Sequence, residues 1–141
     1  MFFTKNKKGQ QMTIDELIEN FQLLNDWEDK YRYLIELGER LPAFSPTDKT
    51  DKNEVEGCQS QVWITHQQQG DKHLFNATSD AHIVRGLQMI LLTAVNNRTT
   101  KEIQSLNILD LFKKMGLEEH LSPSRRNGFQ AMINRIFSLI L

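Results

Sequence analysis

The stretch Glu56-Gly57-Cys58-Gln59-Ser60-Gln61-Val62-Trp63 contains the only cysteine of this 141-residue chain. Gly57 allows sharp or positive-φ backbone conformations that other residues resist. Neutral amides and a hydroxyl follow Cys58, and an apolar run begins at Val62. The stretch therefore predicts a thiol at the tip of a turn that leads into a β-strand.

Residues on both sides of this turn predict a small antiparallel sheet. Val55 is expected to lie on a short strand that leads into the turn, and residues 62–65 have the composition of a strand. Residues 69–72 indicate a hairpin turn, after which residues 73–75 return as a strand. We expect about three strands, with Cys58 at one end of the sheet.

Helices are predicted before and after the sheet, from apolar residues at helical spacing and from capping signals. The expected N-cap residues are Thr13, Asp26, Ser79 or Asp80, Thr99 and Ser122. The helix that follows Asp80 has the broadest apolar face, so it is expected to be central. A short helix over 108–115 is expected to end at Gly116.

These elements predict a single domain of the α+β class with two layers, a small antiparallel sheet packed against helices. Hydrophobic residues make up 39% of the chain and charged residues 25%, the balance of a folded domain with a core. Residues 1–11 carry no helical or strand pattern and are interpreted as a flexible tail, with Met12 as an alternative start. Residues 12–141 are interpreted as the folded domain.

Charge and hydropathy exclude several classes of partner. The formal net charge is −1, from 17 basic and 18 acidic residues, so no overall field attracts nucleic acid. The sequence shows neither a signal-peptide core nor an apolar run of membrane-spanning length, so no membrane partner is expected. A single thiol without an export signal predicts a cytoplasmic protein.

The chemistry open to Cys58 is limited by its being the only cysteine. One thiol forms neither an internal disulfide nor an all-cysteine metal site, so any sulfur chemistry needs sulfur from another molecule. Isolated cysteines are often inert small hydrophobes, and that interpretation stays open here. The position of Cys58 directly after a glycine in a polar turn favours the other interpretation, a reactive thiol.

Other catalytic and metal sites have little support in the sequence. His66 and His73 lie on the two sides of the predicted hairpin and can approach each other. Two histidines and one cysteine at no standard spacing do not indicate zinc, so no metal site is predicted. A Cys–His hydrolase would need a base that no motif marks.

The octet around Cys58 resembles the signature of the SufE/CsdE family, sulfur acceptors that work with cysteine desulfurases. Three further segments resemble family segments, so the likeness runs in order from about Asp26 to Ile136. These segments are Asp26-Trp27-Glu28-Asp29-Lys30-Tyr31-Arg32-Tyr33, Ser79-Asp80 with Ile83-Val84-Arg85-Gly86-Leu87, and His120-Leu121-Ser122-Pro123-Ser124-Arg125.

This resemblance implies a fold similar to the IscU-type scaffold proteins and a sulfur carrier, not an enzyme in its own right. Cys58 would accept persulfide sulfur from a SufS/CsdA-like, pyridoxal-phosphate-dependent cysteine desulfurase, stimulate it, and relay sulfur to an iron–sulfur scaffold complex. The pyridoxal phosphate would reside in the partner, so no cofactor is expected here. Candidate supports of the cysteine loop or of the partner interface are Glu56, Gly57, Gln59, Asp80 and Arg125.

Three alternatives remain open at this stage. The protein can instead regulate the desulfurase without carrying sulfur, relay sulfur to tRNA modification as a CsdE-like protein, or act as an independent thiol enzyme. The residues do not separate the SufE branch from the CsdE branch of the family, and they leave the oligomeric state open.

Overall fold

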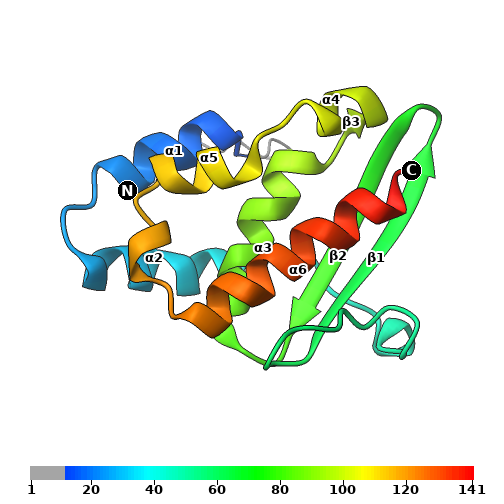
Figure 1. The fold of residues 1–141 in the computed structure, drawn as a ribbon, viewed down its shortest axis with the longest axis horizontal. Helices are drawn as coiled ribbons and strands as arrows, with labels where there is room; N and C mark the ends of the chain where they lie inside the picture. Colours follow the sequence, from blue (N-terminus) through cyan, green and yellow to red (C-terminus); the bar gives the residue numbers. More distant parts are fainter. Residues whose placement is uncertain (1–11) are drawn as a thin grey trace.

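The computed structural model describes residues 12–141, which form helices and a three-stranded antiparallel sheet with strand order β1-β2-β3. The helices form one layer and the strands the other (Figure 1). The predicted α+β class and its small antiparallel sheet are therefore confirmed. The predicted tail, residues 1–11, lies outside the described residues.

A long hairpin makes up most of the sheet. Strands β1 (Val62–Gln69) and β2 (Lys72–Ser79) pair over their whole lengths, from Val62 opposite Ser79 to Gln69 opposite Lys72. Both strands are longer than the sequence predicts. Gly70, at φ 63°, allows the tight turn between them because it carries no Cβ.

The third strand is not the one predicted. Strand β3 (Arg98–Thr99) pairs with the start of β2, whereas the segment around Val55 forms no strand. Instead, Glu54 and Trp63 make an isolated bridge. The prediction of a strand at Val55 was wrong. The chain leaves the sheet directly after Val55 and forms the loop of residues 56–61, so the segment pairs with β1 only at an isolated bridge.

The helices begin and end as follows: α1 (Ile14–Gln22), α2 (Trp27–Gly38), η2 (Pro46–Asp48), α3 (His82–Val95), α4 (Thr100–Gln104), α5 (Ile108–Lys114), η3 (Glu118–His120) and α6 (Pro123–Leu139). Capping boxes form at Thr13 and Thr99, and Ser122 caps α6, so these predictions are confirmed. The prediction for α3 was wrong. Its N-cap is Ala81, and no side chain caps it.

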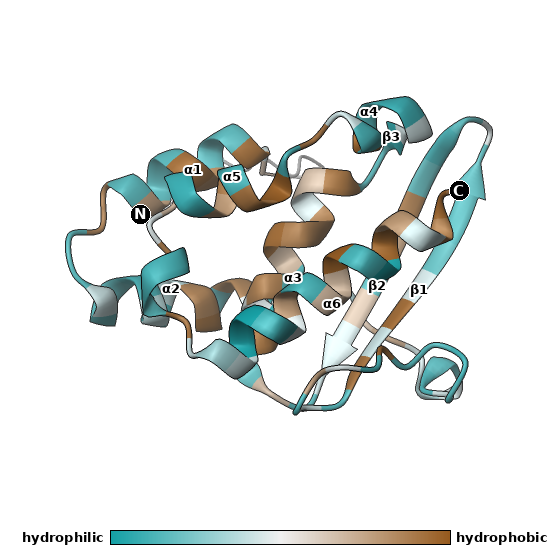
Figure 2. Cartoon of the chain, in the orientation of Figure 1, coloured by the Kyte–Doolittle hydropathy of each residue, from teal (hydrophilic) through white to brown (hydrophobic). Residues whose placement is uncertain are grey.

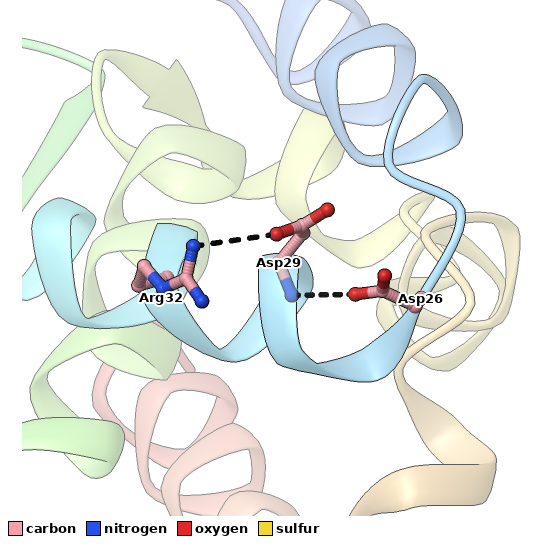
Figure 3. Close-up of polar contacts among 3 residues, drawn as sticks. All are labelled: Asp26, Asp29 and Arg32. Carbon is pink, nitrogen blue, oxygen red and sulfur yellow. Dashed lines mark hydrogen bonds and ion pairs between the residues drawn. The ribbon is translucent and has the colours of Figure 1, made fainter.

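The first turn of α2 shows how local these capping signals are. Asp26 Oδ1 accepts a hydrogen bond from the backbone N of Asp29 at 2.9 Å (Figure 3). The Asp29 carboxylate in turn pairs with Arg32 at 3.5 Å, three residues further on. The Arg32 side chain is 72% exposed, so this ion pair contributes little to stability.

Helix α3 is the central helix, as its apolar composition predicts, and it is largely brown in Figure 2. It packs against β2 and against α2. At the crossing with α2, a Cβ on Gly86 would lie 2.2 Å from the backbone O of Leu34. The two helices therefore approach each other so closely that only glycine fits.

Candidate functional site

The Cys58 loop, defined here as residues 56–61, leaves the sheet between two paired residues. Val55 N donates to Val62 O at 2.8 Å and closes the base of the loop. Gly57 has φ 91°, a left-handed conformation that glycine adopts without strain. The sequence-based expectation of a turn at Gly57 with Cys58 beside it matches this geometry.

The Cys58 loop lies on the first half of α6. A Cβ on Gly128 would lie 3.6 Å from Cys58 Sγ, and a Cβ on Gly57 would lie 3.5 Å from the Ala131 Cβ. The thiol also points to the Gly128 carbonyl at 3.7 Å, the length of a weak S–H···O contact. Small residues on α6 thus let the loop backbone come close to the helix.

Cys58 is half-buried and borders a cavity of about 80 Å³. Its walls combine apolar side chains from β1, α3 and α6 with polar side chains from the loop and from the first turn of α6. Its lining residues are Cys58, Gln59, Ser60, Val62, Val84, Leu87, Ser124, Arg125, Gly128, Phe129 and Met132. A cavity needs about 10–15 Å³ of such volume to hold one water, so this cavity has room for a small group attached to the sulfur.

Burial raises the pKa of the Cys58 thiol above its usual range, because the thiolate loses solvation there. At neutral pH the resting thiol is therefore more fully protonated than a free cysteine. Since the thiolate is the nucleophile, the buried thiol is less reactive than an exposed one. Moving the loop into water would lower the pKa and raise the reactivity.

The C-terminal end of the loop is held by the residues that end β2. Asp80 Oδ1 accepts a hydrogen bond from Gln61 N at 3.1 Å, and Ser79 Oγ donates to Gln61 O at 2.7 Å. Ser79 Oγ also accepts from Ala81 N at 3.2 Å. Ser79 and Asp80, the two predicted N-caps of α3, thus bind Gln61, the residue before β1. Neither side chain accepts a hydrogen bond from the first turn of α3.

Arg125 is, within residues 12–141, the only charged residue that lines the cavity, and it sits in the first turn of α6. Its backbone N donates to the N-cap Ser122 Oγ at 3.3 Å. Its Nε atom is buried and makes no hydrogen bond with the described residues. Arg125 therefore adds a cationic group to the lining of the cavity.

The other predicted site residues fall in two groups. Gln59 lines the cavity beside Cys58, whereas Glu56 is exposed and is not among the lining residues. Sequence reasoning assigned the apolar wall to the core alone and did not single out Ser60 or Ser124. The spacing of Gly128 and Ala131 on one helix face was a usable signal for a close backbone contact.

The two hairpin histidines do approach each other, and neither lines the Cys58 cavity. His66 Nε2 lies 2.8 Å from His73 Nδ1, and His73 Nε2 lies 2.7 Å from Thr100 Oγ1. Among the described residues, no group of three or more His, Cys, Asp or Glu side chains is arranged to hold a metal ion. In the same part of the chain, no helix has the length and apolar composition to cross a bilayer.

Comparison with known proteins relates this site to a family. The model of SufE, the Fe-S metabolism associated domain, matches residues 15–140. An uncharacterized SufE-like protein of Rhizobium meliloti strain 1021 is 45% identical over 130 residues, 89% of this chain and 93% of that protein. Another, of Rhizobium etli, is 43% identical over 136 residues, 92% of each chain.

A solved structure shares the fold. A hypothetical protein from Thermus thermophilus, determined in solution, superimposes with a TM-score of 0.74 at 19% identity. The match covers 92% of this chain and 96% of that one. At this identity the likeness concerns the fold alone.

Proposed function

This chain belongs to the SufE family of Fe-S metabolism associated domains, and on that premise we propose that Cys58 accepts sulfur from a cysteine desulfurase. The family accounts for a sulfur-transfer role in general. The single observation that carries the specific proposal is the half-buried Cys58 beside a cavity that has room for an added sulfur atom.

The proposed reaction is a thiol exchange in which electrons balance without an external oxidant. The Cys58 thiol releases its proton, and the thiolate attacks the outer sulfur of a persulfide on the partner. The S–S bond of that persulfide breaks, the partner cysteine leaves as a thiolate, and a new S–S bond forms on Cys58. The terminal sulfur then carries the negative charge or a proton.

The surroundings of Cys58 support storage of this product. A persulfide on Cys58 would extend into the cavity, where Val62 and Phe129 contribute to an apolar wall that limits access of reductants. Arg125 supplies a cation to the same cavity, and we propose that it stabilises the terminal sulfur anion. The sequence contains no second cysteine to release the sulfur by forming an internal disulfide.

Transfer requires the thiol to leave its resting position, because it faces α6 and its burial disfavours the thiolate. We propose that binding of the desulfurase opens the loop about Gly57. The hydrogen bond between Val55 and Val62 closes the base of the loop, and Asp80 holds its C-terminal end. Opening would then be confined to the loop and leave the sheet intact.

The partner is proposed to be a SufS/CsdA-like enzyme that holds its own pyridoxal phosphate, in the cytoplasm. Iron–sulfur cluster assembly is the proposed destination of the sulfur, since the family is described by its place in Fe-S metabolism. A reducing compartment suits a protein whose single thiol must remain free.

Intact-protein mass spectrometry tests the proposal after incubation with a cysteine desulfurase and free cysteine. The wild type should gain the mass of one or more sulfur atoms, the gain should be reversed by reductant, and Cys58→Ser should show none. Stimulation of the desulfurase without any adduct on Cys58 would refute the carrier role and leave a purely regulatory protein.

A further inference from the structure

One face of α6, from Gly128 to Arg135, contacts the chain between residue 52 and Cys58. Gly128, Ala131 and Arg135 are spaced three and four residues apart, so they lie on the same side of the helix. Gly128 faces Cys58 and Ala131 faces Gly57. The segment therefore runs antiparallel to α6, and its beginning lies beside Arg135.

Arg135 binds the backbone just before the Cys58 loop. Its Nη1 donates to Glu54 O at 3.2 Å, and its Nη2 donates to Lys52 O. Both acceptors are neutral carbonyls, so in each of these hydrogen bonds only the donor group, the guanidinium, carries a charge. The planar guanidinium reaches two carbonyls at once, which a lysine ammonium on a flexible stem does poorly.

We propose that Arg135 is a positioning residue for Cys58. It holds the N-terminal side of the loop against α6, as Asp80 holds the C-terminal side, and so limits how often the thiol leaves the cavity. In the wild type Glu54 stays attached, so only the loop opens, from the Gly128 end of the helix. Without the two Arg135 hydrogen bonds, residues 52–55 would also move away from α6 and carry Cys58 with them. The importance of this role for sulfur transfer rests on the proposed function, but the geometry itself does not.

The alkylation rate of Cys58 in the isolated protein tests this proposal without any desulfurase. Arg135→Met keeps the apolar stem and removes both hydrogen bonds, so the iodoacetamide reaction should accelerate by at least about tenfold, the factor expected for the loss of even one hydrogen bond to a charged group. Arg135→Lys should restore part of the protection. Arg32→Met removes the same charge from an exposed position on α2 and should leave the rate unchanged.

The urea dependence of the same rate separates loop opening from unfolding of the domain. Local opening exposes little surface, so the faster alkylation in Arg135→Met should depend weakly on urea. Equal rates in wild type and Arg135→Met would overturn the proposal. A faster rate with the full urea slope of global unfolding would also overturn it, since Arg135 would then stabilise the whole fold.

Sulfur loading adds a readout that depends on the proposed function. Once loaded by a desulfurase, Arg135→Met should lose its added sulfur to reductant faster than wild type, by a factor similar to that for alkylation. Absence of an adduct on wild type would refute the acceptor function while leaving the alkylation result valid. Equal decay in the two proteins, despite normal loading, would contradict the positioning role.

Discussion

The Cβ position of Gly128 lies 3.6 Å from Cys58 Sγ, so the thiol meets α6 with no side chain in between. This distance is an ordinary van der Waals contact, and an alanine methyl fits there without displacing the loop. A larger side chain does not fit, because Cys58 Cβ and Cα lie at 3.9 and 4.0 Å. Residue size at this position should therefore control the exposure of the thiol.

Gly128→Ala should remain folded and gain stability, because alanine costs less conformational entropy in a helix by about 0.5–1 kcal/mol. Gly128→Leu should instead displace Cys58 and accelerate its alkylation. Thermal unfolding and iodoacetamide kinetics on both variants measure the two effects. A destabilised alanine variant, or a leucine variant with a wild-type alkylation rate, would contradict this account of the contact.

Asp80→Ala should loosen the C-terminal side of the Cys58 loop, because Gln61 N loses its acceptor. We expect Cys58 alkylation to accelerate about fivefold, as for the loss of one hydrogen bond at a solvent-exposed site. Asp80→Asn keeps a side-chain oxygen and should show a smaller change. Asp71→Ala, at the exposed hairpin turn, is the control, and a rate change in Asp71→Ala equal to that in Asp80→Ala would exclude a specific effect.

Gly86→Ala should destabilise the domain by about 3 kcal/mol or more, since its methyl would clash with the Leu34 carbonyl at the α2–α3 crossing. Urea denaturation measures the loss. Gly70→Ala is the contrasting variant, because a Cβ there meets no atom within 4 Å and is strained only by φ 63°. It should cost about 1–2 kcal/mol, and an equal loss in the two variants would argue against the clash.

The free energy of unfolding should fall as the pH drops below about 6.5, the ordinary pKa of a histidine side chain. Burial, and secondarily the neighbouring His73, lower the pKa of His66 in the folded protein. The unfolded chain then binds the proton more readily, so protonation favours unfolding until the pH passes below the folded pKa. Urea midpoints between pH 7 and 5 should fall less in His66→Gln than in wild type; parallel curves would rule out His66 as the source.

Much of the fold could be predicted from sequence because its signals are local. The capping boxes at Thr13 and Thr99 involve residues three positions apart, and they form as the sequence predicts. The apolar face of α3 likewise depends only on helical spacing. The turn at Gly57 followed from the conformational freedom of glycine, and it placed Cys58 correctly on a loop.

The tertiary structure alone decided the contacts that surround the thiol. Asp80 and Gln61 are 19 positions apart, and Arg135 and Glu54 are 81 apart. Local propensity assigned Asp80 or Ser79 to a helix cap and missed strand β3. Asp80 and Arg135 reach their hydrogen-bond partners only when the hairpin, α3 and α6 pack together. The sequence alone thus determined the helices and the turn that carries Cys58, whereas packing determined the cavity, the loop anchors and the shielding of the thiol, because these arise from residues distant in the chain.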